Sequence, residues 1–238
     1  MKKNIIILFL LLFSPAFIFS QVIDTLNKVD AKGKKQGYWK KYVNDTLKYE
    51  GRFVNNIPTG QFIYYHGNGA IKAKSFYSQN GKFSSTSIYN DKGKLRAEGF
   101  YYDTKKDSLW KYYGENDTLC AEEHYRKGIW VGVWKTYYSD GVLDEQKSWV
   151  NDTLNGPWKQ YYSDGKIKLE GKYIKNKMEG IFKYYFPEGG VFYTGVYKKS
   201  LKDGVWMQFN EKGQGILKET YDNGDLLKSE ELKPVEKK

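Results

Sequence analysis

The sequence predicts a mostly β fold: an elongated, single-layer antiparallel meander of about eight β-hairpin repeats with a period of 24 residues. The first observation is a column of aromatic residues spaced 24 apart, comprising Tyr65, Tyr89, Tyr113, Tyr137, Tyr161, Tyr185 and Phe209. A second column with the same step is also aromatic and comprises Tyr77, Tyr101, Tyr125, Trp149, Tyr173, Tyr197 and Tyr221. A third is aliphatic and comprises Ile71, Leu95, Leu119, Leu143, Ile167 and Val191. Such a fixed period is typical of repeat architectures.

The composition favours exposed β-structure. The chain contains 22 Tyr, 13 Phe and 7 Trp, and Tyr tolerates partial burial on a sheet. This aromatic content excludes a disordered chain, the mean hydropathy of −0.72 excludes a polytopic membrane protein, and a single Cys excludes a disulfide-framed domain.

Residues 1–20 have the pattern of a secretory signal peptide cleaved near Ser20. Lys2 and Lys3 precede an apolar run that ends at Phe19 and is shorter than the roughly 20 residues a membrane-spanning helix needs. An uncleaved membrane anchor is the alternative. We expect a protein exported through this signal peptide to the periplasm, the outer surface or the medium, and cleavage would lower its net charge from +11 to +9.

The rest of the chain divides into three segments. Residues 21–36 lack periodicity and are expected to form a lead-in segment, residues 37–227 form the repeat array, and the mixed-charge residues 228–238 form a frayed tail.

Residues 156–179 are the clearest single unit. Two short segments rich in aromatic and β-branched residues flank Ser163-Asp-Gly165, which is a hairpin turn signal, and a second turn is expected around Asn176. The third unit is degenerate because Ser84 replaces a Gly and Thr86 replaces the Trp or Phe of the other units. We expect a weakened hairpin there, within the array, and no domain boundary.

The recurring pattern Gly-x-Trp-x-x-Tyr-Tyr-x-Asp-Gly-x-Ile, followed by Glu and then Tyr, resembles the MORN repeat in its bacterial variant form. The match is best at residues 132–143 and 156–173 and extends over about residues 37–227. The resemblance implies a β-hairpin repeat protein. Repeats of this family occur in membrane-associated scaffolds, in lipid-kinase regulatory segments, in exported bacterial proteins and in proteins labelled antitoxins. These are the functional classes that the resemblance implies.

Strand alternation predicts two different faces. A candidate binding face carries a column of large rings together with the aliphatic and second Tyr columns; its rings are Trp39, Phe62, Trp110, Trp134, Trp158, Phe182 and Trp206. A candidate basic–aromatic face carries alternating Lys and Tyr beside recurring Glu; its residues include Lys111, Tyr113, Lys135, Tyr137, Lys159, Tyr161, Lys183 and Tyr185. A bulge in the first strand of a unit would instead merge the two aromatic columns onto one face.

The sequence points to no catalytic or metal site. His66 and His124 have no metal-ligand spacing, the acidic residues recur with the repeat, and Cys120 has no catalytic partner nearby. We therefore expect no enzyme, no cofactor and no metal.

A short motif, Asp-Thr-Leu or Asp-Ser-Leu, occurs five times and resembles the acceptor of O-glycosylation systems in exported bacterial proteins. The candidate acceptors are Thr25, Thr46, Ser108, Thr118 and Thr153. The alternative is turn chemistry, since Asp and Thr both favour turns.

The expected function is a non-catalytic, exported protein-interaction or scaffold module of the cell envelope. Its expected partner is another protein, bound through the face with the large rings. Two alternatives stay open: an antitoxin-like or immunity protein that binds a toxin, and a binder of anionic phospholipid or glycan through the Lys–Tyr face. Export argues against a nucleic-acid partner, and the oligomeric state stays open.

Overall fold

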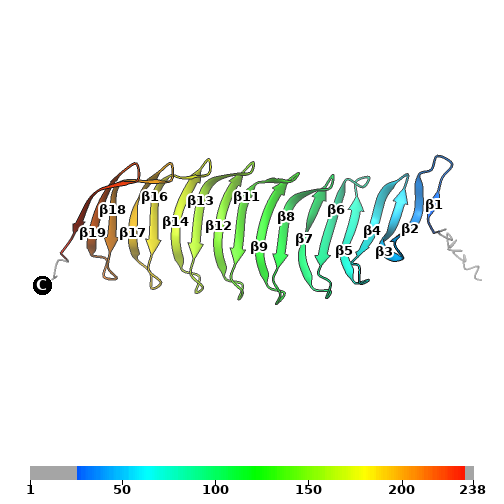
Figure 1. Cartoon of the computed structure of the whole chain (residues 1–238), viewed down its shortest axis with the longest axis horizontal. Coiled ribbons are helices and arrows are strands. Elements are labelled where there is room, and N and C mark those ends of the chain that lie inside the picture. The colour runs from blue at the N-terminus through cyan, green and yellow to red at the C-terminus, as the bar shows by residue number, and fades with distance from the viewer. Residues whose placement is uncertain (1–25, 234–238) are drawn as a thin grey trace, which may run out of the picture.

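The computed structural model describes residues 26–233, so the predicted signal peptide and Thr25 lie outside the described residues. Within 26–233 the chain forms twenty strands, contains no helix and is one long, curved sheet (Figure 1). The strands are β1 (Lys28–Val29), β2 (Lys35–Val43), β3 (Thr46–Val54), β4 (Ile57–Tyr65), β5 (Ile71–Ser78), β6 (Phe83–Tyr89), β7 (Leu95–Tyr102), β8 (Lys105–Tyr113), β9 (Leu119–Arg126), β10 (Ile129–Trp130), β11 (Gly132–Tyr137), β12 (Leu143–Val150), β13 (Thr153–Tyr161), β14 (Ile167–Ile174), β15 (Lys177–Met178), β16 (Gly180–Tyr185), β17 (Val191–Lys198), β18 (Leu201–Phe209), β19 (Gly215–Asp222) and β20 (Asp225–Glu231).

The predicted antiparallel meander is confirmed. Consecutive strands pair antiparallel from β1 against β2 to β19 against β20, except that β10 and β11 both pair with β9, and β15 and β16 both pair with β14. The eight expected hairpins account for sixteen positions in this order, with β10 and β15 as short pieces split from β11 and β16. The outermost strands differ from expectation: β1 lies within the lead-in segment, and β20 runs to Glu231 within the segment expected to fray.

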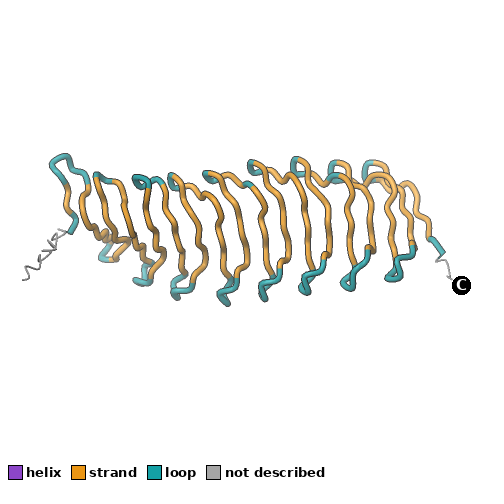
Figure 2. The backbone as a smooth tube through the Cα atoms, turned by 180° about the vertical axis from the view of Figure 1, so that it is seen from behind, coloured by secondary structure: helices purple, strands orange, loops and turns teal. Residues whose placement is uncertain are grey.

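Two rows of turns border the sheet (Figure 2). In one row an Asp or Asn side chain accepts backbone N–H groups two and four residues later, as at Asn90, and a Gly with positive φ follows. The other row has two-residue turns whose central residues both have positive φ, as at Asn44 and Asp45, the pattern of a type I′ turn, except at the degenerate unit, where residues 79–82 form a four-residue loop. The two kinds of turn expected from the sequence, at the Asp-Gly positions and around Asn176, are therefore both present.

A β-bulge recurs in nearly every hairpin and overturns one prediction. The register shifts between Tyr112 and Tyr113, so Tyr113 lies opposite Leu119 while Tyr112 lies opposite Ala121. Residues directly opposite each other share a face. The aliphatic column therefore lies beside the tyrosines of the Lys–Tyr face, and its predicted place beside the large rings is wrong. The bulge is in the return strand, where it moves this column and leaves the two aromatic columns on separate faces.

Candidate interaction faces

We call the side of the sheet that carries the large rings the Trp face. Its rings pack in rows along the sheet, and the second Tyr column joins them as predicted. Tyr197, for example, contacts both Phe182 and Trp206 edge-on, with ring centroids 4.8 and 4.9 Å apart. Because the sheet has a single layer, these rings bury one another and form the core of the molecule.

Burial of a ring depends on the residue eleven positions earlier, in the preceding strand. Where that residue is Gly, the ring sits directly on its backbone: Phe62 is 2% exposed over Gly51, and Trp110 is fully buried over Gly99. Phe182 over Gly171 and Trp206 over Gly195 repeat the arrangement.

Three of the seven candidate rings are only half-buried: Trp39, Trp134 and Trp158. At Trp134 and Trp158 the residue eleven positions earlier is Glu123 or Lys147 in place of Gly. The four fully buried rings offer no surface to a partner, so a molecule bound to this face would meet mainly the tyrosines around them. Whether the Trp face binds anything stays a prediction.

Lysines cover some of these rings. The ammonium nitrogen of Lys106 lies 4.8 Å from the ring centroid of Trp110, and Lys35 and Lys202 stand over Trp39 and Trp206 at 4.8 and 4.9 Å. All three lysines occupy the same place, four residues before the ring, and such cation–π contacts stabilise the stack.

The degenerate unit continues the sheet but changes its core. Strand β6 pairs with β5 in a regular register, with Ser75 directly opposite Thr86. Both residues are buried and their hydroxyls are 2.8 Å apart. A hydrogen-bonded pair of small side chains thus replaces the Gly–ring pair, and the strand pairing of the sheet continues through this unit.

The opposite side, which we call the Lys–Tyr face, carries repeated clusters of Lys, Tyr and Glu. The hydroxyl of Tyr137 donates to Glu122 at 2.8 Å, and Lys135 lies 3.5 Å from the same carboxylate. Tyr185 and Lys183 contact Glu170 at 2.6 and 3.4 Å.

The remaining candidate residues of this face follow the same plan. Tyr113 donates to Glu98 at 2.6 Å, while Lys111 and Lys159 lie directly opposite Glu98 and Glu170 in the register. The predicted grouping of Lys, Tyr and Glu on one face is therefore what the structure has.

These contacts shift the pKa values of the tyrosines and glutamates in the clusters. Partial burial, and then the hydrogen bond to Glu170, raises the pKa of Tyr185 to about 12. Burial and the Glu122 hydrogen bond do the same for Tyr137. The hydrogen bond from Tyr185, followed by Lys183, lowers the pKa of Glu170. The face therefore carries paired charges near neutral pH, and its lysines are partly neutralised.

The Lys–Tyr face also exposes an apolar row that sequence reasoning missed. We define it by six side chains that are 37 to 61% exposed: Phe76, Phe100, Val133, Ile181, Val196 and Val205. Ile181 lies directly opposite Val196, and a hollow of about 460 Å³ is lined by Phe76, Phe100 and Leu109. The signal lay in two places in the sequence. Three members of the row come just before a large ring, namely Val133, Ile181 and Val205, and three come just before a tyrosine of the second column, namely Phe76, Phe100 and Val196.

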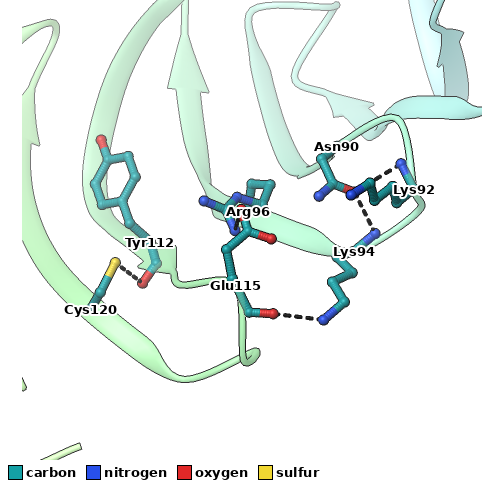
Figure 3. Close-up of polar contacts among 7 residues, drawn as sticks. All are labelled: Asn90, Lys92, Lys94, Arg96, Tyr112, Glu115 and Cys120. Atoms are coloured by element: carbon teal, nitrogen blue, oxygen red, sulfur yellow. Dashed lines mark hydrogen bonds and ion pairs between the residues drawn. The ribbon is translucent and has the colours of Figure 1, made fainter. Parts of the chain in front are cut away.

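Turns of successive units are braced to one another (Figure 3). The ammonium of Lys94 donates to the carbonyl of Glu115 at 2.6 Å, and Arg96 lies 3.0 Å from the Glu115 carboxylate. The thiol of Cys120 donates a hydrogen bond to the carbonyl of Tyr112 at 3.3 Å, which links the paired strands β9 and β8.

The histidines make local contacts of the same kind. His66 bonds the Tyr89 carbonyl of the next unit and His124 bonds the Val133 carbonyl, each at 3.0 Å.

Among the described candidate acceptors of the Asp-Thr/Ser-Leu motifs, Thr46, Thr118 and Thr153 lie beside turns, whereas Ser108 lies within strand β8. Thr46 and Thr153 follow type I′ turns and hydrogen-bond to the carbonyls of Asn44 and Asn151. Ser108 is exposed with φ of 58°, and Thr118 follows Asp117 in a turn. Turn chemistry thus accounts for the motif at Thr46, Thr118 and Thr153 but not at Ser108, and modification stays a prediction.

Residues 26–233 contain no group of three or more His, Cys, Asp or Glu side chains able to hold a metal ion. No helix in this range is long and apolar enough to cross a membrane.

Comparison with known proteins identifies the repeat. Residues 130–151, 154–175 and 178–199 match the model of the MORN repeat variant. No curated protein matches the chain.

Solved structures give weaker matches. A TarM mutant of S. aureus in complex with fondaparinux, α-GlcNAc-glycerol and UDP is 14% identical, with a TM-score of 0.30, over 39% of this chain and 18% of that one. A GtfA/B complex bound to UDP and GlcNAc is 13% identical, with a TM-score of 0.22, over 49% of this chain and 22% of that one. The chain thus spans about a fifth of the length of these proteins, and the likeness carries no conclusion about function.

Proposed function

Because residues 130–199 are three consecutive MORN-variant repeats, we propose that the chain is a non-catalytic protein-interaction module of the cell envelope. It is exported through residues 1–20 and presents one long sheet face to another protein. Repeats that contact only their neighbours build extended binding surfaces in this way.

The exposed apolar row on the Lys–Tyr face carries this proposal. Phe76 and Ile181 are 59 and 61% exposed on a sheet that has no second layer to cover them. Apolar side chains gathered on one face and flanked by polar groups mark protein-binding surfaces. The neighbouring Lys, Tyr and Glu clusters supply a polar border, as in the contact of Lys183 with Glu170.

Binding to an anionic phospholipid or glycan surface has weaker support. Such a surface would need free positive charge, whereas Lys135 and Lys183 are held beside Glu122 and Glu170. A protein partner requires no such excess. Identifying the captured partner decides between a structural envelope protein and a toxin.

The experiment has two arms and a matched control. The exported full chain is used to capture proteins from envelope fractions, beside the variants Phe76→Ser/Ile181→Ser and Val54→Ser/Val150→Ser. Val54 and Val150 are 53 and 51% exposed but lie beside turns, outside the apolar row. We expect a stable equimolar complex with the wild type and the control pair, and its loss with the first pair.

The second arm measures binding to vesicles that contain anionic phospholipid, as a function of salt. Steeply salt-dependent vesicle binding without any equimolar protein complex would support the lipid alternative and refute the proposal. The mass of the exported protein tests cleavage near Ser20 separately, and it also reports any added hexose.

A further inference from the structure

The Trp face is hollowed at the degenerate unit. A cavity of about 400 Å³ opens there, lined by Tyr64, Ala73, Tyr77, Lys82, Ser84, Thr86 and Tyr101 among others. Thr86 occupies the position that a Trp or Phe fills in every other unit. The cavity therefore lies where the row of large rings is interrupted.

Two tyrosines that would border a ring at position 86 are in place. In complete units the second-column Tyr lies between two successive rings, as Tyr197 does between Phe182 and Trp206. Tyr77 contacts Phe62 at 5.1 Å on one side of the gap, and Tyr101 contacts Trp110 at 4.9 Å on the other. Each lines the cavity and has a large ring on one side only.

Lys82 corresponds to the lysines that stand over large rings in other units, so the cavity has a lysine as well as two tyrosines at its border. It stands four residues before Thr86, as Lys106 stands four before Trp110, and its carbonyl accepts a backbone hydrogen bond just as that of Lys106 does. Lys106 is half-buried over an indole ring, whereas Lys82 is exposed and lines the cavity. A ring placed in the cavity would come within reach of this ammonium.

The floor of the cavity is polar. Ser75 and Thr86 satisfy each other at 2.8 Å. Ser84 is only 4% exposed and brings a third hydroxyl-bearing side chain to the lining of the cavity. A hydroxyl in the lining can accept a hydrogen bond from the N–H of an indole or the O–H of a phenol.

We propose that this cavity is a binding site for an aromatic side chain of another polypeptide, Trp above all. The site uses the contacts with which this chain holds its own rings: two flanking tyrosines and a lysine. It lies on the face opposite the exposed apolar row and does not rest on the function proposed above. A sugar could also stack on tyrosine, and this alternative is an outcome of the test.

The test measures binding of N-acetyl-L-tryptophanamide to the full chain by NMR titration. N-acetyl-L-leucinamide, a methyl glucoside and a short peptide with one internal Trp are the comparison ligands. We expect saturable binding of the Trp amide and of the peptide, and binding of the Leu amide at least about tenfold weaker, because it gains no cation–π contact and no ring packing.

Three variants locate the site. Ser75→Gly/Thr86→Trp supplies the missing Gly–ring pair and should abolish binding while the protein keeps its β-sheet circular dichroism. Lys82→Met, at an exposed position, should weaken binding roughly two- to fivefold. Lys92→Met, at an exposed turn, should leave binding unchanged and serves as the matched control.

Several results would overturn the proposal. One is the absence of saturable binding of the Trp amide up to about 10 mM, where even a weak site would be occupied. Another is binding that neither Lys82→Met nor the filled variant weakens. Binding of the glucoside in preference to the Trp amide would indicate a sugar site, and binding of the amide but not the peptide would indicate a free small molecule.

Discussion

The indole ring of Trp110 rests directly on the backbone of Gly99. A Cβ atom added to Gly99 would stand 2.5 Å from Cδ2 of this ring, closer than real Cβ contacts come. The same relation joins Gly51 to Phe62, Gly171 to Phe182 and Gly195 to Trp206. The ring and the glycine across the strand pair are thus one packing unit, repeated along the sheet.

Gly99→Ala is therefore expected to destabilise the protein by about 1–3 kcal/mol through overpacking. Gly67→Ala is the control, because no atom lies within 4 Å of an added Cβ there and the change should stay within about 0.5 kcal/mol. Urea denaturation of both variants provides the measurement. Equal midpoints for the two would contradict the close packing of Trp110 on Gly99.

The Ser75–Thr86 pair suggests a double-mutant cycle on the same site. Gly99→Ser and Trp110→Thr should each be costly alone, but the double variant recreates a pair that the chain already uses at 2.8 Å. We expect a favourable coupling free energy of about 0.5–3 kcal/mol. If the free-energy losses of the two single variants simply add in the double variant, residues 99 and 110 contribute to stability independently and the expectation is wrong.

Ser108 has a backbone conformation that favours Gly. Its φ is 58°, and the equivalent residues Gly60, Gly132 and Gly204 have φ of 64, 70 and 68°. Ser108→Gly should therefore stabilise the fold by about 0.5–1 kcal/mol. Ser84→Gly is the matched control: Ser84 holds the same repeat position without a positive φ, so this change should not stabilise. Melting temperatures of the two variants give the comparison.

We expect the side chains of the Trp face to contribute more to the free energy of unfolding than those of the Lys–Tyr face. Trp206→Ala removes a fully buried ring and should cost about 3–5 kcal/mol. Lys183→Ala removes an ion pair whose Lys side chain is 45% exposed, and it should cost no more than about 1 kcal/mol. Chemical denaturation measures both, and similar losses would mean that the rings are not the core.

The Tyr185–Glu170 hydrogen bond predicts a pH dependence at both ends of the scale. The folded state lowers the pKa of Glu170 below its ordinary value of 4.5, so this carboxylate contributes stability above that pH and loses it as the pH falls further. The folded state raises the pKa of Tyr185 to about 12 from 10.0, so that stability is complete below pH 10 and declines as the pH rises toward 12.

Melting temperatures from pH 3 to 12 test this dependence. Glu170→Gln should flatten the acid limb relative to the wild type, and Tyr185→Phe should flatten the alkaline limb. Leu226, an exposed residue of the last strand, offers the control Leu226→Ala, which should leave both slopes unchanged. Parallel profiles for wild type and variants would show that this pair is not responsible.

Much of the fold could be predicted from the sequence because its signals are local. The 24-residue period, the alternation along each strand and the two turn types act within a few residues, and they predicted the eight hairpins and the Lys–Tyr–Glu grouping. Trp110 and Lys111, as neighbours in one strand, had to lie on opposite faces.

What the sequence did not reveal depends on contacts between strands. The bulge opposite Tyr113 moved Leu119 to the Lys–Tyr face, and a register shift of this kind is decided by pairing across the sheet. The burial of Trp110 depends on the Gly99 backbone of the preceding strand, although Gly recurs eleven residues before several rings and the sequence held that signal.

By itself, then, the sequence determined a repeated β-hairpin and the alternation of its residues, because backbone geometry fixes both within one unit. The tertiary structure alone decided which rings are buried, which apolar side chains stay exposed and that a cavity opens where Thr86 interrupts the row of rings. The physical reason is that a single-layer sheet has no second layer to cover it. Each side chain is therefore buried or exposed according to its neighbours across the strands, from Phe62 over Gly51 to the open cavity above Thr86.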